Sequence, residues 1–204
     1  SRMHADLEKF VSSGKIPADF AARLNQFSPG KYVMHQDLGV GKVAAWSLAK
    51  SKIKIDFEKG NEGKIFGLKL AFNQLTPIPA GHFLITCFDD PEGCAKQAAG
   101  KDTMLDFIRM VLTSNISLRE GINDVLPMQP EDLEKFLSGR VIEAADWKNW
   151  WEKARAAMRD NPSFRLPTKR GEAIVLRTAT SAAEALLADY TDATSLESCV
   201  RILD

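Results

Sequence analysis

The sequence predicts an α+β fold in which a small antiparallel β-barrel is joined to an all-helical domain. Three observations support this. Glycines divide residues 30–67 into short runs of β-forming residues. One run, residues 52–58, alternates strictly between charged and apolar side chains. Beyond Pro79, apolar residues recur at the spacing of amphipathic helices. We therefore expect three segments along the chain: N-terminal helices at 1–28, a barrel at 29–79 and a helical domain at 80–204.

The first 28 residues are predicted to form two short helices. Apolar residues recur at helical spacing over residues 5–11, and Gly14 ends this helix. Pro17 suits the first turn of a second helix, because its missing N–H would be unpaired there anyway. Phe20, Ala21 and Leu24 then share one face, which should pack on the rest of the protein.

Four or five short strands are expected in the barrel. The clearest is Lys52–Glu58, whose apolar residues lie on one face and charged residues on the other, as in a half-buried strand. The loop at 59–63 has the glycines of a hairpin. The other expected strands are Lys31–His35, Val40–Ser47, Lys64–Phe66 and Leu75–Ile78, with a turn at Asp37–Gly39 and one helical turn at Leu68–Gln74. So many short strands in about 50 residues suggest a barrel of the SH3 or Tudor type.

The second half of the chain is predicted to be mainly helical. Trp147, Trp150 and Trp151 fall on one stripe of its strongest helix. Three such indoles either form an exposed platform for a partner or fill the core, and we favour the core. The expected helices are Pro91–Ala99, Asp102–Thr113, Ser117–Leu126, Pro130–Leu137, Asp146–Met158, Ser181–Asp189 and Ser195–Leu203, with a linker at Ser163–Gly171 and a strand at Ala173–Leu176.

Composition and charge indicate a globular protein of the cytoplasm. Of 204 residues, 45% are apolar, and 27 basic residues balance 27 acidic ones. No apolar run approaches the ~20 residues of a membrane span, and the first residues lack the apolar stretch of a secretory signal. Three cysteines cannot all pair within one chain, which favours a reducing compartment. We therefore expect no membrane partner. The absence of a polar tail suggests a fragment of a longer protein.

The charge is unevenly distributed along the chain. Residues 30–70 contain eight lysines against four acidic residues, a net charge of +4. Residues 89–136 contain five basic and ten acidic residues, a net charge of −5. Any contact with a polyanion should therefore be local.

The sequence Gly39-Val40-Gly41-Lys42 resembles part of a phosphate-binding loop, in which glycines allow close backbone approach and a lysine meets the phosphate. The complete motif needs an earlier glycine and a Ser or Thr after the lysine. Gln36 and Val43 occupy those positions. We therefore interpret this glycine pair as part of a turn between strands.

No catalytic, cofactor-binding or metal-binding residue is predicted, and we expect that the protein is not an enzyme. Candidate metal ligands cluster in one stretch but lack the spacing of known sites; they are His82, Cys87, Asp89, Asp90 and Cys94. Cys87 lies between apolar residues and is expected to be buried. The three histidines lie near no nucleophile motif.

Residues 28–79 resemble the RNA polymerase interaction module of the CarD family and of transcription-repair coupling factors. The matching pattern is Phe27-x-Pro29-Gly30-x-Tyr32-Val33-x-His35, then Gly39-Val40-Gly41-x-Val43, then the alternating strand that ends at Phe57. In this chain Lys31 follows the first glycine, where those modules often have an acidic residue.

Residues 30–177 are also similar to the N-terminal extension of unusually long Gre-type transcript cleavage factors. The shared motifs are Gly39-x-Gly41-x-Val43, Ile55–Glu58, Leu75–Pro79, His82, Trp147–Trp151, Asp160–Pro162 and Leu166–Arg170. Relatives commonly have a histidine in the loop where this chain has Glu62-Gly63. No heptad pattern is long enough for the coiled coil with which Gre factors stimulate cleavage. The resemblance thus implies the extension without the cleavage part.

The resemblance implies a barrel that binds bacterial RNA polymerase, presenting an edge strand to a lobe of the β subunit. Strand position selects four partner-binding candidates: Trp46 and Lys50 after the second strand, and Lys64 and Phe66 on the fourth. Trp46 is equally consistent with the barrel core. Two alternatives remain: direct contact of the basic barrel with nucleic acid, and a helical adaptor whose barrel recognises a peptide.

Overall fold

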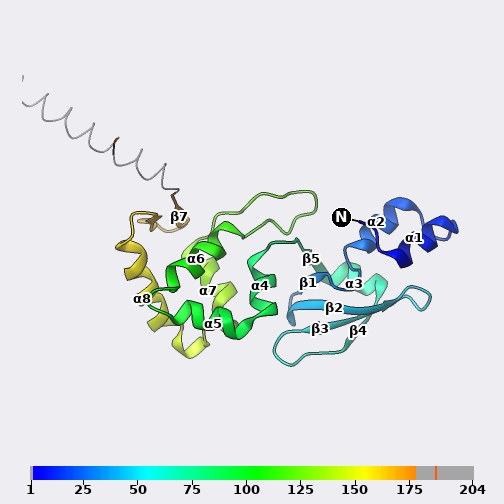
Figure 1. Ribbon diagram of the computed structural model, residues 1–204, viewed down its shortest axis with the longest axis horizontal. Coiled ribbons are helices and arrows are strands. Elements are labelled where there is room, and N and C mark those ends of the chain that lie inside the picture. Colours follow the sequence, from blue (N-terminus) through cyan, green and yellow to red (C-terminus); the bar gives the residue numbers. More distant parts are fainter. Residues whose placement is uncertain (1, 178–186, 188–204) are drawn as a thin grey trace, which may run out of the picture. The chain divides into compact units, whose positions relative to one another are not determined.

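The computed structural model describes residues 2–177 and residue 187. The chain divides into two compact units, each containing helices and a β-sheet (Figure 1), which confirms the predicted α+β class. The first unit comprises residues 1–91 and 116–125, and the second comprises 92–115 and the chain from 126 onward. The predicted limits at 28 and 79 mark changes of secondary structure, and as domain boundaries they stay a prediction.

The first unit contains a five-stranded sheet and four helices among the described residues. Its elements are α1 (Ala5–Ser12), α2 (Ala18–Asn25), β1 (Tyr32–His35), β2 (Gly39–Ser47), β3 (Lys52–Phe57), β4 (Lys64–Gly67), α3 (Leu68–Gln74), β5 (Leu75–Ile78) and α4 (Phe83–Asp89). The predicted N-terminal helices, the strands and the helical turn before β5 are confirmed. Helix α4 was not predicted, because its apolar side chains lie almost all round the helix and show no 3.6-residue pattern.

The five strands form one curled antiparallel sheet, a half-barrel with the order β4-β3-β2-β1-β5. Alternation along β3 places Ile53, Ile55 and Phe57 in the core and leaves Lys52 and Lys54 exposed, as predicted. The inner face of the sheet packs with residues from α3 and with Phe27, which follows α2. This core consists of Phe27, Val33, Val43, Ile53, Ile55, Phe57, Phe66, Ala71 and Leu75.

The two glycines of β2 serve different purposes. Gly39 has φ +76° in the turn after β1, a conformation that glycine adopts without strain. Gly41 lies against the core, where a Cβ atom would be 2.6 Å from Phe57 Cδ1 and 2.7 Å from Ile55 Cγ2. The interpretation of this pair as a feature of the sheet, and not of a phosphate loop, agrees with both positions.

Replacing Gly41 with alanine should lower the free energy of unfolding of the first unit by about 2 kcal/mol, because an added methyl group overpacks a filled core. Urea unfolding followed by circular dichroism measures this loss. Gly67→Ala is the matched control, since Gly67 has φ −66° and its added Cβ would meet only Ser51 O, at 4.0 Å. Equal losses for the two variants would contradict the prediction.

The second unit contains helices and a two-stranded sheet. Its elements are most of α5 (Pro91–Ala99), α6 (Met104–Thr113), α7 (Pro130–Leu137), the 3₁₀ turn η1 (Ala144–Asp146), α8 (Trp147–Arg159), β6 (Phe164–Arg165) and β7 (Val175–Leu176). Of the seven helices predicted for the second half of the chain, four are confirmed, namely α5, α6, α7 and α8. Trp147 and Trp150 are buried and Trp151 is half-buried, so the core interpretation holds for the first two indoles.

The predicted helix at Ser117–Leu126 is wrong. This segment is a loop whose ends are held by an antiparallel bridge between Ile116 and Val125. The Ser117 N–H also donates to the Asp124 carbonyl at 2.8 Å. Gly121 within it has φ +77°, which is incompatible with a right-handed helix.

Two other predictions concern the end of the chain. Strand β7 confirms the second half of the strand expected at Ala173–Leu176, whereas β6 was not predicted and lies in the expected linker. The helices expected at Ser181–Asp189 and Ser195–Leu203 lie outside the described residues, apart from Leu187. Within the described part of the chain, no helix has both the length and the apolar character needed to cross a membrane.

Candidate functional site

Strand β4 forms one edge of the half-barrel, and β3 is its only partner in the described part of the sheet. The Leu68 N–H donates to the Ser51 carbonyl at 2.9 Å, so this pair belongs to the ladder between the two strands. Hydrogen-bonded and non-hydrogen-bonded pairs alternate in antiparallel sheets. The main-chain groups of Phe66 therefore face β3, and those of Ile65 and the N–H of Gly67 face the open edge.

The opposite edge of the sheet is less suited to strand addition. It is formed by β5, which pairs with β1 through the register Tyr32 to Ile78 and Val33 to Pro77. Pro77 lacks an N–H group, and Pro79 follows the strand directly. Proline on an edge strand removes a main-chain donor and discourages pairing with another chain. The β4 edge is therefore the better acceptor of an added strand.

The side chains around β4 combine one exposed apolar group with several cations. Ile65 is 65% exposed and lies opposite Lys54 on the outer face of the sheet. Lys52 and Lys64 are also exposed on β3 and β4. The loop before β4 is fixed by a hydrogen bond from the Gly63 N–H to Asp56 Oδ1 at 2.8 Å. We call Ile65, Gly67 and the flanking Lys50, Lys52, Lys54 and Lys64 the β4 edge site.

The four predicted partner-binding residues lie in different environments. Lys50 is exposed in the turn after β2, and Lys64 is exposed at the start of β4. Trp46 is half-buried, and its Nε1 donates to Asp6 Oδ2 at 3.1 Å while its ring meets the His4 ring edge-on at 5.2 Å. The N-terminal segment thus covers this indole. The role of these residues in partner binding stays a prediction.

Phe66 is the buried member of the four candidates. Its side chain is buried inside the half-barrel, with its ring 6.0 Å from the ring of Phe57 and 5.9 Å from that of His35. The residue that projects outward is Ile65, which sequence reasoning missed. The register with β3 supplies the distinction: Ile53 faces the core, so its partner Phe66 does so too, and Ile65 points away.

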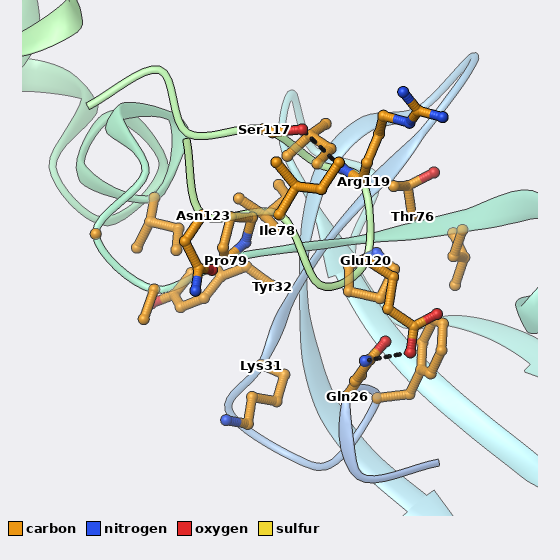
Figure 2. Close-up of a pocket in the computed structure, with 18 of the residues that line it drawn as sticks. Gln26, Lys31, Tyr32, Thr76, Ile78, Pro79, Ser117, Arg119, Glu120 and Asn123 are labelled. Carbon is orange, nitrogen blue, oxygen red and sulfur yellow. Dashed lines mark hydrogen bonds between the residues drawn. The ribbon is translucent and has the colours of Figure 1, made fainter. Parts of the chain in front are cut away.

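A cavity of about 890 Å³ lies beside β5, at the edge of the sheet opposite to β4 (Figure 2). It is bounded by β5, by the end of α2 and by the loop 117–123. Gln26 Nε2 donates to Glu120 Oε1 at 3.1 Å, which ties this loop to the segment after α2. The Arg119 N–H donates to Ser117 Oγ at 3.2 Å within the loop.

Tyr32 is the titratable group in this cavity with a clearly shifted pKa. Burial raises the pKa of the Tyr32 hydroxyl, and its hydrogen bond to Asp89 Oδ1 at 2.6 Å raises it further. Tyr32 therefore stays protonated at neutral pH and acts as a donor. Among residues 2–177, no group of three His, Cys, Asp or Glu side chains is placed to hold a metal ion.

Comparisons with known proteins agree with part of the sequence interpretation. Residues 97–181 match the family described as the GRAD helix-turn-helix domain. The chain is 29% identical over 165 residues to transcription elongation factor GreA of Chlamydia pneumoniae, covering 78% of this chain and 21% of the relative. It is 28% identical over 147 residues to GreA of Chlamydia trachomatis serovar D, covering 72% of this chain and 19% of the relative. No solved structure matches.

The chain thus spans about one fifth of the length of these curated relatives. The similarity to GreA factors confirms that part of the predicted resemblance. The similarity to the CarD family and to transcription-repair coupling factors stays a prediction.

Proposed function

We propose that this chain is a transcription-associated module whose first unit binds RNA polymerase through the β4 edge site. The open edge of β4, with exposed Ile65 at its centre, is the observation that carries this proposal. The similarity to proteins named transcription elongation factors supports the choice of partner, because elongation factors act on RNA polymerase. A lobe of the β subunit is the surface we propose for the contact.

The chemistry of the site fits the addition of a strand from the partner. Main-chain hydrogen bonds to Ile65 and Gly67 would provide affinity, and a small apolar pocket on the partner would bury Ile65. The surrounding lysines favour a partner surface of negative potential, which accelerates association and selects among partners. No bond-breaking step is part of this function, and we propose that the module is not an enzyme.

The sharpest test removes one main-chain donor from the edge. Gly67 has φ −66° and ψ 144°, which proline adopts without strain, and its N–H faces away from β3. Gly67→Pro should weaken binding to purified bacterial RNA polymerase about tenfold, the effect of losing about one buried hydrogen bond. Gly67→Ala keeps the N–H and should bind like the unchanged chain. Biolayer interferometry measures both affinities.

Two further comparisons complete the test. Ile65→Asp should weaken capture more than Val125→Asp, which adds the same charge at an exposed residue of the loop 116–125.

Lys50→Glu with Lys64→Glu should slow association, whereas Lys9→Glu with Lys15→Glu should leave it unchanged, since these lysines lie in and just after α1. Equal binding by Gly67→Pro and Gly67→Ala would exclude strand addition at this edge. Failure of the unchanged chain to bind would refute the function.

A further inference from the structure

The cavity beside β5 has no part in the proposed function. It lies within the first unit, because its walls come from residues 23–32, 72–89 and 117–123. Its volume of about 890 Å³ falls within the range of about 300–1,000 Å³ that is typical of ligand sites. The loop 117–123 forms one wall, which the hydrogen bond from Gln26 to Glu120 ties to the segment after α2 (Figure 2). This wall is therefore held in place by the protein itself.

The surface inside the cavity is largely apolar and comes from several elements. The half-buried or exposed apolar residues that line it are Phe72, Pro77, Pro79, Ile85, Leu118 and Ile122. They belong to α3, β5, the segment after β5, α4 and the loop 117–123. Burial of apolar area is the main favourable term in most protein association, so this surface suits an aromatic or aliphatic side chain of a ligand.

Strand β5 itself is unsuited to recognise a ligand by strand addition. Pro77 has no N–H group, and β1 is the strand that pairs with β5 in the described part of the sheet. A ligand beside Pro77 meets a carbonyl acceptor without the neighbouring main-chain donor that an added strand needs. Recognition in this cavity therefore depends on side chains.

The charged groups of the cavity leave positive charge available to a ligand. The five charged residues that line it are Arg23, Lys31, Asp89, Arg119 and Glu120. Both carboxylates are already engaged: Asp89 accepts from the Tyr32 hydroxyl at 2.6 Å, and Glu120 accepts from Gln26 at 3.1 Å. Within the described residues, no salt bridge reaches any of the three cations.

Stacking on an aromatic ring orients Arg23. Its Cζ lies 4.9 Å from the centre of the Phe72 ring. A guanidinium stacked in this way uses its face and keeps its in-plane N–H donors available for a bidentate pair with a carboxylate. Figure 2 shows Lys31 and Arg119 on opposite sides of the cavity, so cations flank the apolar surface on more than one side.

We infer that this cavity binds an acidic peptide segment of a protein partner. An aromatic or aliphatic residue of the peptide would lie against Pro77, Pro79 and Ile85. Asp or Glu residues on either side of it would pair with Arg23 and Arg119. A ligand with acidic groups on both sides of an apolar group matches the arrangement of the cations, and an extended peptide provides it.

A single-stranded nucleic acid fits this cavity less well, although its phosphates would also attract the cations. Such ligands bind largely by stacking their bases on aromatic rings. Both aromatic rings that reach the cavity surface already have a cation over one face: Arg23 lies over Phe72, and Lys42 Nζ lies 5.3 Å from the centre of the Tyr32 ring. The available positive charge therefore favours carboxylates beside an apolar side chain.

Selection from a phage-displayed library of random peptides, with the full chain as bait, tests this inference. The chain with Arg23→Glu and Arg119→Glu serves for counter-selection. Peptides enriched on the unchanged chain should contain an aromatic or aliphatic residue with Asp or Glu beside it. A lack of enrichment over the counter-selected chain, or enrichment of basic peptides, would overturn the inference.

Fluorescence anisotropy with a labelled copy of the most enriched peptide then measures the contribution of each residue. Arg23→Glu with Arg119→Glu should weaken binding at least about tenfold, because attraction becomes repulsion at both positions. Arg23→Lys keeps the charge but loses the bidentate geometry, and should weaken binding about threefold. The matched control, Lys9→Glu with Lys15→Glu in and just after α1, should change affinity less than about twofold.

Thermal unfolding by circular dichroism shows that the variants remain folded, and Arg23→Lys provides a conservative change should the double variant unfold. An equal loss in the control variant would refute the site. Displacement of the peptide by an equal concentration of single-stranded RNA would reveal a general site for polyanions and would refute it too. Gly67→Pro should leave peptide binding unchanged, since Arg23 and Arg119 lie outside the β4 edge site. This inference and the proposed function therefore fail separately.

Discussion

Replacing Trp150 with alanine is expected to lower the free energy of unfolding of the second unit by about 4 kcal/mol. The Trp150 side chain is 6% exposed, and its ring lies 5.1 Å from that of Trp147. Its Nε1 donates to the Ala98 carbonyl at 2.8 Å, which joins α8 to the end of α5. The alanine variant loses this contact area and leaves both a cavity and an unpaired buried carbonyl. Urea unfolding followed by far-ultraviolet circular dichroism measures the loss.

Two variants separate packing from hydrogen bonding at this position. Trp150→Phe retains most of the apolar volume but removes the donor, and should cost about 2 kcal/mol. Trp151→Ala should cost less than Trp150→Ala, because Trp151 is half-buried and its ring stacks on Trp147 at 6.3 Å. A loss at Trp150 no greater than that at Trp151 would show that α8 is not anchored through Trp150.

The second large effect is a loss of stability on acidification caused by His82. This side chain is 1% exposed, and it caps α4 by accepting a hydrogen bond from the Leu84 N–H at its Nδ1, at 3.1 Å. Burial lowers the pKa of His82 to about 4, because the protonated ring cannot be solvated. In the unfolded chain the same group has an ordinary pKa of about 6.5.

The direction of the effect follows from proton binding. Between pH 6.5 and 4 the unfolded chain binds a proton at this residue and the folded protein does not, so acid favours unfolding. The contribution of His82 is fully present above pH 6.5 and is lost as the pH falls toward 4. The free energy of unfolding of the first unit should decrease by about 3 kcal/mol over this range from His82 alone.

His82→Asn isolates this contribution from that of the carboxylates. Asparagine keeps an oxygen that can cap α4 but does not titrate in this range. Chemical unfolding at a series of pH values should therefore show a smaller slope between pH 6.5 and 4 for the variant than for the unchanged chain. If the free energy of unfolding has the same slope against pH in both proteins, the pKa of His82 is not lowered by folding.

Local patterns predicted most of the first unit. The alternation of Lys52–Phe57 determines which side of β3 faces the core, and the flanking glycines mark the turns. Helix α4 escaped prediction because a short, nearly uniform apolar run has no period. The loop 116–125 was mistaken for a helix because apolar spacing is ambiguous over so few residues. Its bridge from Ile116 to Val125 depends on a pairing that sequence spacing does not specify.

The role of the four predicted partner-binding residues stays a prediction, but the structure shows where each of them lies. Strand position selected Lys50 and Lys64, and both side chains are exposed in the structure. The distinction between Ile65 and Phe66 required the register with β3, which sequence spacing alone leaves open by one residue.

Residues 116–125 belong to the first unit but lie in the sequence between two segments of the second unit. This arrangement determines how each unit can be produced separately. A gene truncated after codon 91 would encode the half-barrel without Glu120, the acceptor for Gln26, and without one wall of its cavity. Producing the second unit alone is simpler, because only residues 116–125 have to be removed from within it. Asn115 and Leu126 already exchange main-chain and side-chain hydrogen bonds of 2.8 and 3.1 Å, so a tight turn could rejoin them after excision. The second unit can thus be produced by joining residue 115 to residue 126, whereas the first unit needs residues 116–125 attached again after residue 91.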